Sequence, residues 1–404
     1  MRPKTMLIGR TVAKQLNGSE RFCVTMVTEN FGRYYGNTTS PNGLRGGPKN
    51  GMEAEEKIEG EYLWPEAFLQ LLQKVSQRLP IPPAEQAQIP PIETLQPADL
   101  EGKRITGVDG SHNGKELAGF YFGVAVAMAY TSDWRVISDP SPIFEGDLFR
   151  LNSIFGDLWL SLQDVHFVFT VAKRAVEERR PDWLIVDGPL LLYPSLIPRS
   201  IFFSEEEEIS GMDLDRLESY RTALYRCTDA VLEFFRACRE RRVNVMGLVK
   251  RVRSSLFDRS GRRRDASILQ KHLGYGQMTQ AVAPGKHPSL RLYAKRAKEG
   301  GFEAEVGWED FFKVVYLRSS RVKPPVRLEV PYWVDPRQAA EAVLALSDPI
   351  SGVPVHILRV EGLIRMGDEI LKSIYLRMLG KSATLEDLMP LHGEEFLAAR
   401  WEVG

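Results

Sequence analysis

WLIVDGP, residues 183–189, is the segment from which the fold can be worked out. Its four consecutive apolar residues are followed by an Asp-Gly-Pro turn. An apolar run this short is typical of a strand that is buried on both faces at the centre of a sheet. The segments 103–109 and 243–249 have the same character, and helical patterns separate them from 183–187. We therefore predict an α/β fold with a mixed sheet flanked by helices.

The segments around these three strands complete the expected fold. Strands at 119–130 and 134–140 follow closely on 103–109, which indicates an antiparallel meander. Two late strands are expected at 311–320 and 325–333. Helices are expected at 147–180, 212–241, 266–273, 336–347 and 357–379, and the rest of 251–300 is basic and irregular.

The first hundred residues have a different character. Residues 1–60 contain two short apolar stretches and a turn-rich loop, and 64–78 have helical spacing. A proline-rich stretch follows, which we interpret as a linker or as a strap along the surface. We therefore expect an N-terminal extension and linker at 1–100, the main domain at 101–385 and a C-terminal tail at 386–404.

The composition excludes several classes of protein. The 53 Lys and Arg residues balance the 53 Asp and Glu residues, so net charge does not indicate a partner and only local charge can. Three cysteines without a CxxC pair argue against a disulfide scaffold or a cysteine zinc site. The N-terminus lacks the apolar run of a signal peptide, and no stretch of about 18 apolar residues predicts a membrane span. A reducing cytoplasm is the expected location.

Two aspartates follow apolar strands in the same way, Asp109 in ITGVDGS and Asp187 in WLIVDGP. Carboxyl ends of central strands are where α/β sheets place their ligands, and the glycine after each aspartate leaves space beside it. Two such carboxylates on neighbouring strands make a hard oxygen site for Mn²⁺ or Mg²⁺. The competing interpretation is a simple turn, and the repetition after two buried strands favours the metal site.

Lys250 ends a third apolar strand, and basic residues follow it. A lysine there is placed to contact a phosphate or to orient a water, although taken alone it would only mark the end of the strand. Residues 250–264 carry seven basic residues and one acid, and 286–298 carry five basic residues and no acid. Such segments suit a nucleic-acid backbone, with a solvated loop as the alternative. Phe257 and Tyr293 are candidates for stacking on the bases of a single strand.

The order of these motifs resembles the NurA nucleases over roughly residues 100–380. The resemblance rests on VDGS (108–111), an acid-bearing helix, IVDGPL (185–190), GLVKR (247–251) with two serines close behind, and VRLEVP (326–331). It implies an RNase H-like core, a homodimer and a requirement for Mn²⁺. It also implies 5′ to 3′ degradation of DNA, cleavage of single strands, and work with the hexameric ATPase HerA in DNA-end resection in a prokaryotic cytoplasm.

The resemblance also assigns roles to residues. Asp109 and Asp187 match the two metal-binding aspartates of the family, and Lys250 matches its lysine. The family has a Glu on the helix before the second Asp, and this sequence departs from it. Asp164 is the best candidate there by helix position, because Glu177 and Glu178 lie close to the helix end. The expected DNA-binding residues are Arg251, Arg253, Ser254, Arg262, Arg263, Arg264, Lys286 and Arg291.

The C-terminal part offers further candidates. The family often has a histidine in its C-terminal helix, and here His356 precedes the expected helix while Glu361 lies within it. Helical register favours Glu361, and a structural role for His356 is an equal alternative. Arg327 and Glu329 are spaced to point together into the site or to form a surface ion pair. His112, beside VDGS, either approaches the metal or faces solvent.

Two other functions stay open at this stage. ATPases of the actin and sugar-kinase type also place Asp-Gly turns around a phosphate, but they need a late glycine-rich loop that this sequence lacks. A non-catalytic DNA-holding or motor-anchoring subunit would explain the departure at Asp164. The absence of HExxH, GxSxG and Walker motifs removes support for zincins, serine hydrolases and P-loop ATPases.

Overall fold

The fold is built on one large mixed sheet. The computed structural model describes residues 88–116, 121–134, 138–151, 156–197, 214–258, 263–367, 370 and 373–374. In this part of the chain, the sheet has nine strands in the order β1-β7-β8-β9-β6-β5-β2-β3-β4. The strands are β1 (Ile92–Thr94), β2 (Arg104–Glu116), β3 (Tyr121–Asp133), β4 (Ile143–Leu151), β5 (Trp183–Asp187), β6 (Asn244–Val249), β7 (Gln277–Thr279), β8 (Phe312–Leu317) and β9 (Val326–Pro331).

The direction of pairing changes across the sheet. β2, β3 and β4 form an antiparallel meander, as the sequence predicts. β2, β5 and β6 are parallel neighbours. From β6 outward through β9, β8 and β7 to β1 the pairing is antiparallel again. The central parallel strands are therefore the ones that the sequence identifies by their apolar runs.

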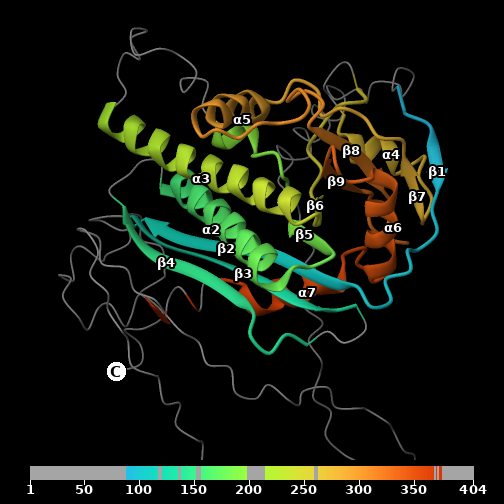
Figure 1. Cartoon of the computed structure of the whole chain (residues 1–404), viewed down its shortest axis with the longest axis horizontal. Helices are drawn as coiled ribbons and strands as arrows, with labels where there is room; N and C mark the ends of the chain where they lie inside the picture. Colours follow the sequence, from blue (N-terminus) through green and yellow to red (C-terminus); the bar gives the residue numbers. More distant parts are fainter. Residues whose placement is uncertain are drawn as a thin grey trace, which may run out of the picture. The chain divides into compact units, whose positions relative to one another are not determined.

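Helices cover both faces of the sheet (Figure 1). The described helices are α2 (Gly156–Arg179), the 3₁₀ turn η1 (Pro194–Leu196), α3 (Leu214–Glu240), α4 (Asp265–Leu269), α5 (Pro288–Glu299), α6 (Pro336–Leu346) and α7 (Val355–Ile364). α2, α3 and α5 pack over one face in a single apolar core. α6 and α7 pack against the other face, in two smaller cores. The expected RNase H-like class, a mixed sheet flanked by helices, is confirmed.

The pleat of the central strands assigns their side chains to these two cores. Val108 and Val186 lie in the core under α2 and α3, whereas Ile105 and Ile185 lie in the core under α6. Because successive residues of a strand point to opposite faces, Asp109 and Asp187 share the face of Ile105 and Ile185. Both aspartates are therefore directed toward the side that α6 and α7 cover.

Two expectations about the first half of the sheet are not met in the described residues. Residues 147–151 belong to β4 and not to a helix, because they pair with β3 in the register Val124↔Leu148. Leu148, one of the apolar residues whose spacing suggested a helix, packs instead against a core that includes residues of β3. Of the expected third strand at 134–140, residues 135–137 lie outside the described part of the chain, and the described residues 134 and 138–140 are not in a strand; the next strand that the structure describes begins at Ile143.

The second half of the sequence contains more regular structure than expected. The segment 251–300 was expected to hold one short helix, but it also contains β7 and the twelve-residue α5. The many basic residues of α5 obscured its helical pattern in the sequence; Arg291, Lys295 and Lys298 are exposed, while Leu290, Leu292 and Tyr293 are buried. α7 ends at Ile364 and residues 365–367 are not helical, but the described residues Ile370, Ser373 and Ile374 are, so the helix expected at 357–379 is interrupted.

The proline-rich stretch ends in the sheet. β1 forms an edge strand beside β7, and Leu95 and Leu100 behind it are buried. The strands and the helix expected before residue 79 lie outside the described residues. Within the described residues, none of the helices combines the length and the apolarity that a membrane crossing needs.

Candidate active site

The parallel pairing of β2 and β5 brings two aspartates together. Val108 and Val186 are Cα partners in this pair, so the next residues, Asp109 and Asp187, lie side by side on adjacent strands. They point to the same face of the sheet for the reason given above. Two residues distant in the chain thus present their carboxylates to one place at the end of β5.

The two aspartates differ in their local structure. Asp187 ends β5, and Gly188 after it has φ +130, a conformation that favours glycine. Asp109, which was expected to end its strand, lies in the middle of β2, because the β2–β3 hairpin continues to Glu116. The expectation of a turn at Gly110 is therefore wrong. Gly110 instead allows α2 to approach, since a Cβ there would lie 2.1 Å from Asp164 Oδ1.

Ionising both carboxylates of this pair at once is unfavourable in free energy. Burial raises the pKa of Asp109 to about 8, and the negative charge of Asp187 adds to this rise. Burial also raises the pKa of Asp187, against the opposing effect of Lys250. A cation beside the pair would remove the repulsion and allow both groups to be charged at neutral pH.

Lys250 lies between two of the acids. Its Nζ is 2.7 Å from Asp187 Oδ2 and 3.0 Å from Glu361 Oε2. Burial alone would lower the pKa of Lys250, but the two carboxylates raise it, so the side chain is a stable cation. Glu361 belongs to α7 and contributes to the raised pKa of Asp187. Asp109, Asp187, Lys250 and Glu361 thus form one cluster, which we call the acid–lysine cluster.

Asp164 is placed differently from Glu361. It belongs to α2, which covers the opposite face of the sheet, and its Oδ2 is 2.8 Å from His112 Nδ1. His112 continues β2 and is therefore not a turn residue. Asp164 Oδ1 is buried without a hydrogen-bond partner, and the charge of Asp164 helps to raise the pKa of Asp109. Of the two acids, Glu361 contacts Lys250 of the cluster directly, whereas Asp164 acts on Asp109 through its charge.

The donor set of the acid–lysine cluster fits a hard divalent cation. Carboxylate oxygens are the ligands that Mn²⁺ and Mg²⁺ prefer. A bound divalent cation would also reduce the electrostatic repulsion between Asp109 and Asp187. In the described part of the chain, no three His, Cys, Asp or Glu side chains are arranged as a complete ligand shell. Lys250 pairs with two of the candidate carboxylates, those of Asp187 and Glu361.

A buried ion pair supports the chain segment that follows Asp187. Glu329 and Arg327 on β9 are linked at 2.7 Å, and Glu329 is 1% exposed, so the pair is not a surface one. Glu329 Oε2 accepts a hydrogen bond from Leu191 N at 2.9 Å. Tyr293 donates to Leu190 O at 2.7 Å and accepts from Leu192 N at 3.2 Å. Segment 190–192 is therefore held from two directions.

His356 has the structural role that was one of its two alternatives. It is fully buried at the start of α7, and its Nε2 is 3.0 Å from Ser132 Oγ. Burial lowers its pKa to about 4, so it is neutral at ordinary pH. α7 lies very close to β2 here, since a Cβ at Gly107 would be 2.8 Å from the backbone carbon of His356.

The expected DNA-binding residues divide into two groups. Arg251, Arg253, Arg264, Lys286 and Arg291 are exposed. Ser254 and Arg263 make internal contacts, with the hydroxyl of Tyr316 at 2.9 Å and with Asp258 at 3.8 Å. Arg262 lies outside the described residues.

The proposed stacking residues are wrong. Tyr293 is fully buried and Phe257 is 5% exposed, so neither ring can receive a base. Tyr293 supports segment 190–192, and the ring of Phe257 packs edge-on against Tyr316 at 5.1 Å. Their places in basic segments suggested surface positions, but each segment folds back to bury its aromatic residue.

Tyr193 is a residue near the site that the sequence analysis missed. It follows segment 190–192 directly and is 45% exposed. Burial of the hydroxyl raises the pKa of Tyr193, and the charges of Glu329 and Asp187 raise it further while Arg253 and Arg251 lower it. The available signal was a tyrosine at the end of the apolar run LLLY, just before a proline.

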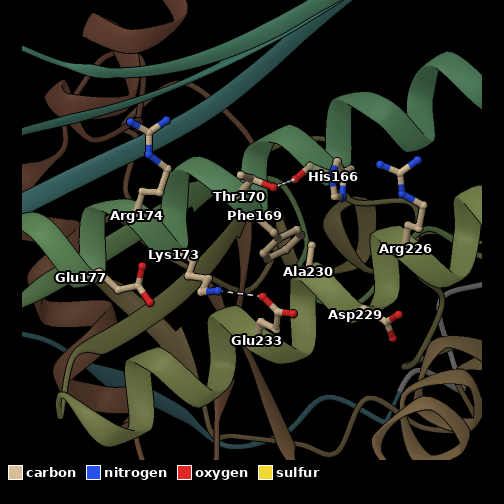
Figure 2. A pocket seen from close by; sticks show the side chains of 10 residues that line it. All are labelled: His166, Phe169, Thr170, Lys173, Arg174, Glu177, Arg226, Asp229, Ala230 and Glu233. Atoms are coloured by element: carbon tan, nitrogen blue, oxygen red, sulfur yellow. Dashed lines mark hydrogen bonds and ion pairs between the residues drawn. The ribbon is translucent and has the colours of Figure 1, made fainter. Parts of the chain in front are cut away.

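The hollow shown in Figure 2 contains none of the predicted site residues. It has a volume of about 270 Å³ and lies between α2 and α3. Lys173 and Glu233 form an ion pair across it at 2.7 Å, and Arg174 is paired with Glu145 and Glu178. These charges neutralise each other, so the hollow is not a candidate for the phosphate site.

Comparison with known proteins identifies relatives of this fold. Residues 103–366 match the model of the NurA domain. The NurA nuclease from Sulfolobus solfataricus has a similar structure, with 13% identity, a TM-score of 0.51, and coverage of 78% of this chain and 92% of the other. NurA with manganese has 12% identity, a TM-score of 0.45, and coverage of 79% and 97%.

A more distant likeness is to endonuclease V from Bacillus subtilis, with 13% identity, a TM-score of 0.35, and coverage of 78% of this chain and 94% of the other. No curated protein matches the chain by sequence. Of these three structures, only the one from Sulfolobus solfataricus has a TM-score above 0.5, and at 13% identity it shows a similarity of fold alone.

Proposed function

The chain belongs to the NurA family, and from this premise we propose that it is a metal-dependent nuclease that hydrolyses phosphodiester bonds of DNA. The observation that carries the proposal is the side-by-side placement of Asp109 and Asp187 on one face of the sheet, with Lys250 beside them. Paired carboxylates with an adjacent cation suit a reaction in which negative charge builds up on a phosphate.

Asp109 and Asp187 would hold Mn²⁺ or Mg²⁺, with Glu361, which contacts Lys250, as the third acid and Asp164 as the alternative. Such an ion, when bound, activates water for attack on phosphorus and neutralises charge on the leaving oxygen. Lys250 is charged and therefore unable to act as a base, so its role is to neutralise charge on the phosphate. The exposed Arg251 and Arg253 guide the backbone toward the cluster.

The finer activity follows from the family resemblance. We propose 5′ to 3′ exonuclease activity, endonuclease activity on single strands, and a role in DNA-end resection with a HerA-type hexameric ATPase. We also propose a homodimer in a prokaryotic cytoplasm, with residues 101–385 as the nuclease domain between the N-terminal extension and the C-terminal tail.

A cleavage assay on end-labelled single-stranded and duplex DNA tests this proposal. With Mn²⁺ or Mg²⁺ the protein should cut DNA, and a chelator should stop it. Asp109→Asn and Asp187→Asn should each lower the rate by about 100-fold or more, because each removes a ligand charge at the reacting phosphate. Asp182→Asn is the matched control, since Asp182 pairs with the exposed Lys103 at the other end of β5.

The result that would reject the assignment is a folded Asp109→Asn variant that cuts DNA as fast as the unaltered protein. DNA binding without cleavage across several divalent metals would instead indicate a non-catalytic subunit. The ratio of rates for variants at Glu361 and Asp164 identifies the third acid. The geometry predicts the larger loss for Glu361→Gln.

A further inference from the structure

The described surface offers few aromatic rings to a substrate. Among the described phenylalanine, tyrosine and tryptophan residues, the exposed ones are Tyr193, at 45%, and Tyr275, at 43%. Tyr275 is covered in part by Arg321, whose guanidinium carbon lies 5.3 Å from the ring centre. Tyr193 makes no such contact within the described residues, and it follows Asp187 of the acid–lysine cluster closely in the chain.

The backbone on both sides of Tyr193 is held in place. Before it, Leu190, Leu191 and Leu192 are buried, and Glu329 and Tyr293 bind their backbone atoms. After it, Leu196 and Ile197 are buried, and Tyr220 donates a hydrogen bond to Leu196 O at 2.9 Å. Tyr193 is thus an exposed aromatic residue between two buried anchors. A ring held in this way loses little conformational entropy when a ligand stacks on it.

The charges around Tyr193 suit a nucleic acid. Five residues of chain separate it from Asp187. Gly188 and Leu190 of that segment lie against Gly247 of β6, just before Lys250, Arg251 and Arg253, since a Cβ at Gly247 would be 2.7 Å from Gly188 O and 2.9 Å from Leu190 N. Both arginines are exposed, on the segment that follows Lys250. Within the described residues, no carboxylate forms an ion pair with either of them. An exposed aromatic ring and exposed arginines, on two chain segments that leave the sheet beside the acid–lysine cluster, are a combination suited to binding a single strand.

We propose that Tyr193 is the platform on which a base of a single-stranded substrate stacks while the adjoining phosphate reaches the acid–lysine cluster. This inference rests on the proposed nuclease function. It gives the protein a base-binding subsite that is tolerant of sequence, because every base has an aromatic face. Arg251 and Arg253 hold the backbone on the other side of the same subsite.

The test separates the ring from its hydroxyl. Tyr193→Leu should weaken binding of a single-stranded oligonucleotide by about 5- to 100-fold, measured by fluorescence anisotropy with chelator present. Tyr193→Phe should bind within about two-fold of the unaltered protein, because it keeps the aromatic face. Tyr275→Leu, which alters an equally exposed ring away from the cluster, should have no effect. Urea unfolding of each variant verifies that the fold is retained.

A second arm removes the base instead of the ring. An oligonucleotide made of abasic nucleotides should bind the unaltered protein and Tyr193→Leu equally, because there is nothing to stack. Equal binding of ordinary DNA by the two proteins would overturn the proposal, as would a Tyr193→Leu defect of the same size on abasic DNA. A Tyr193→Phe defect as large as that of Tyr193→Leu would overturn it too, because the hydroxyl would then be the functional group.

The proposed function is judged separately in the same experiment. If the unaltered protein fails to cut DNA with any divalent metal, the nuclease proposal fails, while the anisotropy measurements still decide whether Tyr193 binds bases. If the protein cuts DNA and Tyr193→Leu has unchanged binding, kcat and KM, the stacking proposal alone fails.

Discussion

At the scale of single residues, burial shifts the pKa values of acids and of a histidine in opposite directions. It raises the pKa of Asp109, Asp187 and Glu329, and it lowers that of His356. The reason is the same in each case, since a buried site disfavours the charged form. The acids have cationic neighbours that offset this effect, Lys250 beside the aspartates and Arg327 beside Glu329, whereas no cation or anion offsets it for His356.

His356 should make the stability of the protein depend on pH. Its pKa is about 4 in the folded state and about 6.5 when unfolded, so the unfolded chain binds more protons between these values. Its contribution is therefore fully present above pH 6.5 and is lost as the pH falls toward 4. Between pH 7 and pH 5 the free energy of unfolding should fall by about 2 kcal/mol from this residue.

Urea unfolding of His356→Gln and of the unaltered protein at both pH values measures this contribution. The variant should lack that part of the pH dependence, whereas His272→Gln, at an exposed histidine, should keep it. Identical pH profiles for His356→Gln and the unaltered protein would show that the buried imidazole does not control acid stability.

Glu329 should be important for stability as well as for the site. Glu329→Gln removes the charge that pairs with the buried Arg327, and breaking one partner of a buried pair costs about 3–5 kcal/mol. Glu233→Gln is the matched control, because its pair with Lys173 is exposed and should contribute less than about 1 kcal/mol. Equal unfolding midpoints for the two variants would contradict the role assigned to Glu329.

At the scale of elements, two glycines of β2 determine how closely helices approach the sheet. Gly107 lies under His356 of α7, and Gly110 lies under Asp164 of α2. Successive residues of a strand face opposite sides of the sheet, so Gly107 and Gly110 lie on opposite faces of β2. A helix therefore packs closely on each face of this strand within four residues. The contacts of α7 with β2 bring Glu361 to Lys250, so the close approach at Gly107 also places a residue of the acid–lysine cluster.

Gly107→Ala tests this packing. The added Cβ would lie 2.8–2.9 Å from backbone and side-chain atoms of His356, so α7 must shift. We expect a loss of about 1–3 kcal/mol in the free energy of unfolding, and lower cleavage activity because Glu361 moves with the helix. Gly362→Ala, in the same helix with no atom within 4 Å of the new Cβ, should instead stabilise by about 0.5–1 kcal/mol. A neutral Gly107→Ala would show that α7 is free to adjust.

At the scale of the whole molecule, the sheet extends from the site to an edge that the sequence did not predict. β1 pairs with β7, and Leu95 and Leu100 enter the core under α6. Arg337 of α6 links to Glu93 of β1 at 2.9 Å. Residues just before the expected boundary near 100 therefore contribute to the core of the matched domain.

Substitutions in this segment should lower the stability of the whole domain. Leu95→Ala and Leu100→Ala should each cost about 2–5 kcal/mol, because each leaves a cavity in a packed core. Ile92→Ala, at a position that is 39% exposed in the same N-terminal segment, should cost much less. Thermal or urea unfolding gives these values. Equal small effects at all three positions would mean that the segment is only a surface strap.

Much of the fold could be predicted from the sequence because the decisive signals are local. The apolar runs ending at Asp187 and at Lys250 identify the central strands, and the period of the pleat identifies the face on which each side chain lies. The placing of Asp109 beside Asp187 follows once the two strands are taken as parallel neighbours. Whether these residues hold a metal stays a prediction.

Other features of the protein were decided only by the tertiary structure, because they depend on contacts between segments that are distant in the sequence. Residues 147–151 form a strand because β3 is there to pair with them, although their own spacing suits a helix. Phe257 and Tyr293 are buried, and Tyr193 is exposed, because of what packs around each of them. Glu361 and not Asp164 reaches Lys250 because α7 and α2 cover opposite faces. Local sequence sets each residue's preference, but burial and proximity depend on which other parts of the chain arrive beside it.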